Sequence, residues 1–119
     1  KNIKLPVSAP FHCDLMANAT EVMKKEFENI DFKKSNITLI SNVTADKIDN
    51  VNDLKSLLIN QIEKKVRWRE SIINMIKYGV DHFIEIGPGK VLSGLVKRID
   101  KNVKITSINS ESDIESLRI

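Results

Sequence analysis

The order of signals between residues 80 and 108 constrains the fold of this chain more than any other feature. Val80–Ile86 and Val103–Ile108 are short runs of mostly apolar and β-branched residues, which favour strands. Between them, Gly87-Pro88-Gly89 predicts a tight turn into a helix. The apolar face of that helix is formed by Val91, Leu92, Leu95, Val96 and Ile99. Because helices separate short apolar strands, the sequence predicts an α/β fold, a layered sheet with parallel strand pairs.

The rest of the chain continues this alternation. The opening segment Lys1–Phe11 has an extended character, since its two prolines discourage a helix. Gly79 stands where a helix would end on a residue in the left-handed region. The remaining predicted elements are helices at about Cys13–Asn29, after the cap candidates Asn50–Asp53, at about Arg69–Tyr78 and at Asp113–Arg118, and a strand at Ile37–Ile40.

Composition indicates an ordinary globular protein. The 119 residues suffice for one domain, and no repeat or linker-like segment divides them, so we expect residues 1–119 to form a single unit. A net charge of +3 and an aromatic content of 5% argue against nucleic-acid binding. Apolar runs such as Leu57-Leu58-Ile59 are too short to span a bilayer. The single cysteine, Cys13, fits a reducing compartment, and we expect a soluble, cytoplasmic protein without membrane contact.

Two polar residues are candidates for chemistry. His12 stands between the extended opening and the first predicted helix, and cleft-lining residues in open α/β sheets cluster at the carboxyl ends of strands. A lone histidine is more often a surface or hydrogen-bonded core residue, so position alone leaves its role open. Gln61 follows Leu54 by seven residues and falls on an otherwise apolar stripe. It is either a functional group or a boundary glutamine bonded to nearby backbone.

Several motifs in register carry a resemblance to a known family. The segment around His12, Leu5–Met16, closely resembles the histidine motif of bacterial malonyl-CoA:acyl carrier protein transacylases. Further segments follow in that family's order and spacing, namely Val66-Arg67-Trp68, Gly79–Phe83, Glu85–Leu92, Gly94-Leu95 and Lys97-Arg98-Ile99. The resemblance covers essentially all 119 residues.

The resemblance implies an activity and a mechanism. Members are acyltransferases of fatty-acid synthesis, and this chain matches the C-terminal part of their α/β-hydrolase-like large subdomain. A serine in a Gly-x-Ser-x-Gly elbow attacks the thioester of malonyl-CoA, and the malonyl group then moves to the 4′-phosphopantetheine thiol of acyl carrier protein. The resemblance makes His12 the base that takes the serine proton, and Gln61 the residue whose main-chain carbonyl accepts a hydrogen bond from that histidine.

Further expectations follow from the same resemblance. Phe11, the aromatic before the base, implies a pocket narrowed in favour of malonyl over α-methylated groups; a plain packing role is the alternative. We expect no cofactor and no metal, since only two histidines and one cysteine are present without paired ligand spacing. The whole enzyme is expected to be a monomer in the bacterial cytoplasm or in a plastid-type organelle.

The Gly-x-Ser-x-Gly elbow does not occur within these residues. Ser8 and Ser93 lack the flanking glycines of such an elbow, so neither is a credible nucleophile. We therefore expect that the 119-residue chain alone does not transfer malonyl groups. Two alternatives stay open. In the first the chain is part of a serine hydrolase or thioesterase, and in the second it is a non-catalytic α/β interaction module.

Two basic features invite other readings. Gly87-Pro88-Gly89-Lys90 resembles a phosphate loop, but Val91 stands where the motif needs serine or threonine, which argues against nucleotide binding. A basic cluster is formed by Lys64, Lys65, Arg67 and Arg69. It either docks the acidic carrier protein or the phosphates of coenzyme A, or it is a solvated face.

Overall fold

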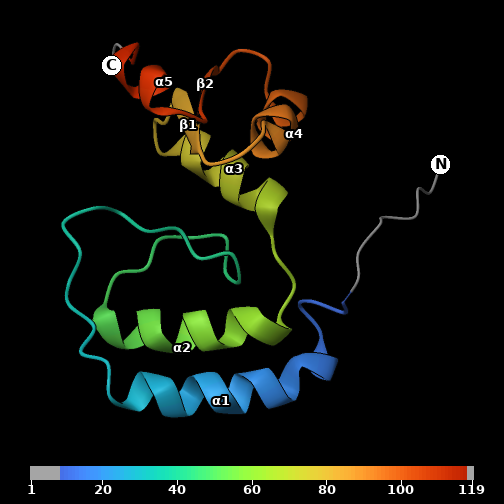
Figure 1. Cartoon of the computed structure of the whole chain (residues 1–119), viewed down its shortest axis with the longest axis vertical. Coiled ribbons are helices and arrows are strands. Elements are labelled where there is room, and N and C mark those ends of the chain that lie inside the picture. Colours follow the sequence, from blue (N-terminus) through green and yellow to red (C-terminus); the bar gives the residue numbers. More distant parts are fainter. Residues whose placement is uncertain (1–8, 118–119) are drawn as a thin grey trace. The chain divides into compact units, whose positions relative to one another are not determined.

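The computed structural model describes residues 9–117 of the chain (Figure 1). Its contacts divide the chain into two compact units, Lys1–Ser71 and Ile72–Ile119, and the division falls within helix α3. The elements are a 3-10 turn η1 (Asp14–Met16), α1 (Ala17–Glu28), α2 (Val51–Glu63), α3 (Trp68–Lys77), β1 (His82–Ile86), α4 (Val91–Ile99), β2 (Lys104–Ile108) and α5 (Glu111–Glu115). The α/β prediction is confirmed, whereas the expectation of a single domain stays a prediction.

Some expectations concern residues that the structure does not describe. The extended opening was predicted for Lys1–Phe11, and residues 1–8 lie outside the described part, as does Arg118 at the end of the last predicted helix. Within residues 9–117, none of the helices combines the length and the apolar character that a membrane span requires.

The first unit is built on a pair of helices, α1 and α2, which lie side by side and run antiparallel (Figure 1). The predicted first helix is present, but it opens with the 3-10 turn η1 before α1 begins. Helix α2 begins as predicted at an asparagine cap, because the side chain of Asn50 accepts a 2.8 Å hydrogen bond from the main-chain N–H of Asp53. The antiparallel arrangement brings the start of α1 close to the end of α2.

The strand predicted at Ile37–Ile40 is wrong. Among the described residues this segment makes only one isolated antiparallel bridge, between Ile40 and Lys47. The Ser35 hydroxyl lies 3.0 Å from the main-chain N of Ile37 and 2.9 Å from its carbonyl oxygen, so at Ile37 local side-chain contacts take the place of ladder hydrogen bonds. The side chain of Ile37 is 76% exposed, which shows that β-branched composition found no sheet face to cover.

The second unit contains the parallel sheet. Strands β1 and β2 pair in parallel, from His82 opposite Lys104 to Ile86 opposite Ile108. Helix α4 connects the strands and contacts both of them, and the buried side chains include Val96, Val103 and Ile108. The predicted strand–turn–helix–strand order is therefore confirmed.

Glycines and caps set the boundaries of this unit. Gly79 has φ 93, and the N–H groups of Gly79 and Val80 donate to the carbonyls of Ile76 and Met75 at 2.9 and 3.0 Å, which ends α3 in a Schellman motif. Helix α5 begins at Glu111, two residues before the predicted start. The reason is a capping box between Ser110 and Asp113, a signal that the sequence carries.

Candidate active site

His12 lies in a tight turn that leads into α1. Its φ is 60, in the left-handed region that non-glycine residues seldom adopt, although histidine does so more often than most. The turn is held by a 3.0 Å hydrogen bond from the Phe11 N–H to the Ala9 carbonyl and by the Cys13 thiol, which lies 3.1 Å from the Pro10 carbonyl. The backbone of the turn thus fixes where the exposed imidazole points.

The imidazole of His12 contacts the main chain at the end of α2. Its Nδ1 lies 2.7 Å from the carbonyl oxygen of Gln61, a residue 49 positions later in the chain. A carbonyl oxygen can only accept, so Nδ1 carries the hydrogen and Nε2 keeps its lone pair in the neutral ring. This contact leaves Nε2 as the ring nitrogen that can accept a proton.

The carbonyl of Gln61 is available because α2 stops two residues later. Lys64, the C-cap residue, is extended at ψ 150, and its N–H pairs with the carbonyl of Asn60 at 2.8 Å. The last carbonyls of a helix have no intrahelical partner and must find another one. For Gln61 that partner is His12, which is the contact that the family resemblance implies.

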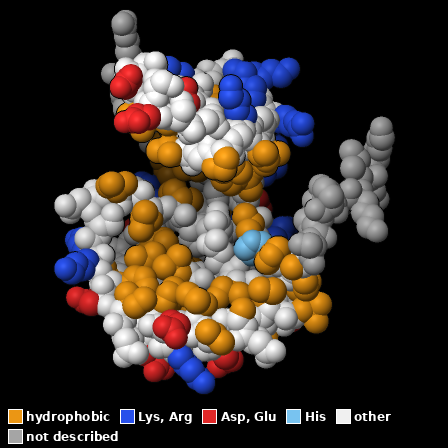
Figure 2. Space-filling model, viewed as in Figure 1, with side chains coloured by type: hydrophobic (Ala, Val, Ile, Leu, Met, Phe, Trp, Pro, Cys, Tyr) orange, Lys and Arg blue, Asp and Glu red, His pale blue; other side chains and the backbone are white. Residues whose placement is uncertain are grey.

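An apolar pocket lies beside this pair. It has a volume of about 320 Å³ and is lined by His12, Met23, Phe27, Leu58, Gln61 and Ile62. Figure 2 shows hydrophobic side chains gathered over α1 and α2. The pocket therefore places an apolar wall beside the exposed imidazole.

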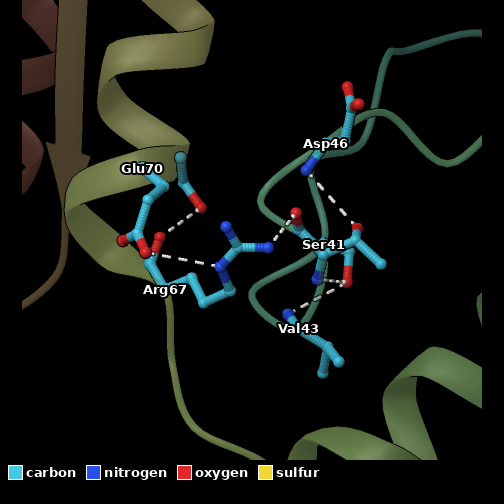
Figure 3. A network of polar contacts seen from close by, with 7 residues as sticks. Ser41, Val43, Asp46, Arg67 and Glu70 are labelled. Carbon is cyan, nitrogen blue, oxygen red and sulfur yellow. Dashed lines mark hydrogen bonds and ion pairs between the residues drawn. The ribbon is translucent and has the colours of Figure 1, made fainter.

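Other residues singled out by the sequence lie elsewhere. Phe11 is 61% exposed and does not line the pocket, so its role in substrate choice stays a prediction. Arg67 turns toward the connection that precedes α2 and donates to the Thr44 carbonyl at 2.9 Å (Figure 3). Lys64 and Lys65 remain exposed next to the candidate site.

In the second unit, polar side chains form hydrogen bonds within the sheet and between the sheet and α4. Nε2 of His82 lies 2.8 Å from the Thr106 hydroxyl across the two strands, and the hydroxyls of Ser93 and Ser107 lie 2.8 Å apart. The Glu85 carboxylate accepts from the N–H groups of Leu92 and Ser93 at 3.0 and 2.7 Å. The Ser93 side chain and these N–H groups hold the pKa of Glu85 below its ordinary value. These contacts join β1 to the first turn of α4.

Sequence reasoning missed the pocket itself. Met23 and Phe27 belong to the apolar spacing of the first predicted helix, and Leu58 and Ile62 to that of the second. The pattern predicts that these residues face inward, but it does not distinguish a filled core from an open pocket. Across residues 9–117, the structure has no cluster of three or more metal-ligating side chains of the His, Cys, Asp or Glu type.

Comparison with known proteins relates the chain to named relatives. It is 45% identical over 113 residues to the malonyl CoA-acyl carrier protein transacylase of Bacillus subtilis, a match that covers 95% of this chain and 36% of the relative. A solved structure of the Clostridium perfringens transacylase is 44% identical with a TM-score of 0.85, over 96% of this chain and 36% of that one. No protein-family model matches.

A third match includes a partner protein. The solved complex of a type II PKS acyl-carrier protein with its malonyl-transacylase is 31% identical with a TM-score of 0.86, over 94% of this chain and 36% of that chain.

These matches and the α/β fold make the chain similar to one part of known acyltransferases. More particularly, the chain is homologous to the C-terminal part of the malonyl CoA-acyl carrier protein transacylases. It spans about 36% of the length of the curated relatives that it matches.

Proposed function

We propose that this chain supplies the histidine-bearing part of a malonyl-CoA:acyl carrier protein transacylase that acts in fatty-acid synthesis. The observation that carries the proposal is the 2.7 Å contact between His12 Nδ1 and the Gln61 carbonyl, beside an apolar pocket. The names of the curated relatives supply the reaction. We propose malonyl-CoA as the donor, the pantetheine thiol of acyl carrier protein as the acceptor, and no resident cofactor or metal.

In the proposed reaction, Nε2 of His12 acts as the general base. It takes the proton of a serine hydroxyl, supplied by polypeptide outside these residues, as the serine oxygen attacks the malonyl thioester carbon. The imidazolium then gives that proton to the departing coenzyme A thiolate, which leaves a malonyl-serine ester. In the second half the imidazole takes a proton from the pantetheine thiol, whose sulfur attacks the ester, and returns it to the serine oxygen. A positioned base contributes about 10²–10⁴-fold to such steps.

Gln61 acts through its main chain in this scheme. Its carbonyl holds the hydrogen on Nδ1 and orients the ring, which is the part that a carboxylate or amide plays in other triads. Because a substitution leaves the carbonyl in place, Gln61→Ala should retain most of the activity. This separates Gln61 from His12, whose ring is the acting group.

Docking of the carrier protein is a further part of the proposal. Lys64 and Lys65 are exposed at the end of α2, next to Gln61, and acyl carrier proteins are acidic. A homologous transacylase forms a complex with an acyl-carrier protein. Replacing both lysines by glutamate should raise the KM for carrier protein at low salt, and an unchanged KM would end the docking idea.

The test uses a chimera, because the chain spans about 36% of its relatives. The matching segment of the Bacillus subtilis enzyme is replaced by this chain, and malonyl transfer from malonyl-CoA to acyl carrier protein is measured. Transfer is expected from the chimera and from its Gln61→Ala form, but not from this chain alone. In the chimera, His12→Asn should lower kcat by about 10²–10⁴-fold; asparagine is chosen because it tolerates the left-handed backbone.

Each result of the chimera experiment is informative. A folded chimera whose His12→Asn form keeps full transfer would overturn the role of His12. Release of free malonate without transfer would favour the hydrolase alternative. The proposed whole enzyme is monomeric and cytoplasmic, and a stable oligomer of the active chimera would contradict the first of these.

A further inference from the structure

The end of helix α2 carries no local stop signal. The residues after Glu63 are Lys64, Lys65, Val66 and Arg67, without glycine or proline. Lysine is a good helix former, so local propensity favours continuation of the helix. The chain nevertheless becomes extended at Lys64, with ψ 150. A contact from outside the helix must therefore end it.

Continuation of the helix would compete directly with the candidate site. In an α-helix the carbonyl of residue i accepts from the N–H of residue i+4. One more residue of α2 would give the Gln61 carbonyl to the N–H of Lys65, in place of His12. The Nδ1 hydrogen bond of His12 therefore depends on how firmly the chain after Glu63 is held extended.

Arg67 is the residue that holds it. Its main-chain N–H donates to the Asn42 carbonyl at 2.9 Å, and its guanidinium donates through Nη1 to the Thr44 carbonyl at 2.9 Å. Figure 3 shows the side chain reaching into the turn formed by residues 41–46. Nε of Arg67 also lies 3.4 Å from the Glu70 carboxylate, which steadies the guanidinium from the other side.

The turn that receives Arg67 is itself rigid. Ser41 is buried, and its hydroxyl accepts from the N–H groups of Val43 and Thr44 at 3.1 and 3.3 Å. Its main-chain N–H donates to Asp46 at 2.9 Å, and its carbonyl accepts from Ala45 at 2.8 Å. Ala45 is fully buried at φ 61. Carbonyls fixed in this way are presented to Arg67 at little further cost in conformational entropy.

We propose that Arg67 is a positioning residue for the candidate active site: by anchoring the chain after α2 to the 41–46 turn, it ends the helix and reserves the Gln61 carbonyl for His12. The proposal rests on the roles given to His12 and Gln61 under the proposed function. It sets Arg67 apart from the basic cluster that the sequence left open as a docking or a solvated face, because its guanidinium is engaged within the first unit.

The experiment reads the tautomer of His12 in this chain by ¹⁵N NMR of the imidazoles, without any need for transfer activity. In the unaltered chain Nδ1 carries the hydrogen. Arg67→Ala should lower the ratio of Nδ1–H to Nε2–H by about tenfold, the effect of one lost hydrogen bond. Arg69→Ala, at an exposed neighbour outside the network of Figure 3, is the matched control. His82, the other histidine, is the internal reference.

A second variant tests the competition itself. Lys65→Pro removes the N–H that would take the Gln61 carbonyl, and proline favours the extended conformation that Lys64 already has. Adding Lys65→Pro to Arg67→Ala should therefore restore the Nδ1–H tautomer. A folded Arg67→Ala chain with an unchanged ratio overturns the proposal, as does a folded double variant without rescue.

The proposal remains testable if the Arg67→Ala chain does not fold. If Arg67→Ala unfolds, the ratio is read in Arg67→Lys, which replaces the planar guanidinium by a flexible ammonium group. An intermediate ratio supports the proposal and an unchanged ratio overturns it. Failure of this inference leaves transfer by the chimera intact. Failure of the proposed function leaves the tautomer result intact, so the two are distinguishable.

Discussion

The two units of this chain set the boundaries of their helices in different ways. In the second unit, α3 ends at Gly79 in a Schellman motif and α5 begins at a capping box, both set by residues within a few positions. In the first unit, α2 ends without a glycine or proline, and its exit is fixed by contacts to residues 42 and 44. Local signals build the sheet unit, whereas the candidate site depends on contacts between segments distant in the sequence.

Among substitutions at these helix boundaries, the largest loss of stability is expected at Gly79. At φ 93 any side chain is strained, although no atom lies within 4 Å of where a Cβ would stand. Gly79→Val should therefore destabilise the second unit by about 1–2 kcal/mol through backbone strain alone. Denaturant unfolding monitored by amide signals of β1 and β2 measures the loss. Gly94→Ala, at a helical glycine with open space around it, is the control and should stabilise the unit, by up to about 1 kcal/mol.

The cap of α2 should give a somewhat smaller effect. Asn50→Ala removes the side-chain acceptor for the Asp53 N–H, and such losses cost about 1 kcal/mol. The contrast predicts that the start of α2 frays while its end, held by Arg67, does not. Hydrogen exchange of the α2 amides measures fraying at each end of the helix. Equal loss of protection at both ends would show that the Arg67 anchor does not hold the C-terminal end independently of the cap.

Acid should loosen the start of α5. The Asp113 carboxylate accepts from the N–H of Asn109 at 2.8 Å and from the hydroxyl and N–H of Ser110, each at 2.9 Å. These bonds, that of Asn109 first, hold the pKa of Asp113 below its ordinary value of 3.8. Their contribution is present above pH 3.8 and is lost as the pH falls through the lower folded value.

The measurement is a titration of the Asn109 and Ser110 amide shifts. An Asp113→Asn chain lacks the acid-dependent change and serves as control. A midpoint above the ordinary pKa of aspartate would reverse the sign and contradict the assignment.

The smallest effect is expected at Ile37. Because this side chain is 76% exposed and its segment pairs in no ladder, Ile37→Thr should change stability by less than about 0.5 kcal/mol. A larger loss in denaturant unfolding would mean that the segment packs as the strand predicted from its composition.

The same contrast explains which parts of the structure can be predicted from the sequence. The strand–turn–helix–strand order of residues 80–108 follows from periodicity and glycine positions, because the competing conformations there are few. The strand at residues 37–40 failed because propensity reports a preference for a pleated face, and no neighbouring strand provides one among the described residues.

For the candidate site, the family motifs pointed to His12 and Gln61, while the physical pattern alone left both open. The reason is that their contact joins a turn to a helix end 49 residues away, and no local signal records such a pairing. The anchor at Arg67 was likewise invisible, since an arginine in a basic run looks the same whether its guanidinium meets solvent or a carbonyl.

The left-handed backbone at residue 12 sets conformational stability against the presence of an imidazole at this position. Glycine or asparagine would occupy φ 60 at a lower conformational cost, but neither carries an imidazole to contact the Gln61 carbonyl. Residue 12 therefore carries a backbone strain for which the proposed role of the imidazole would account.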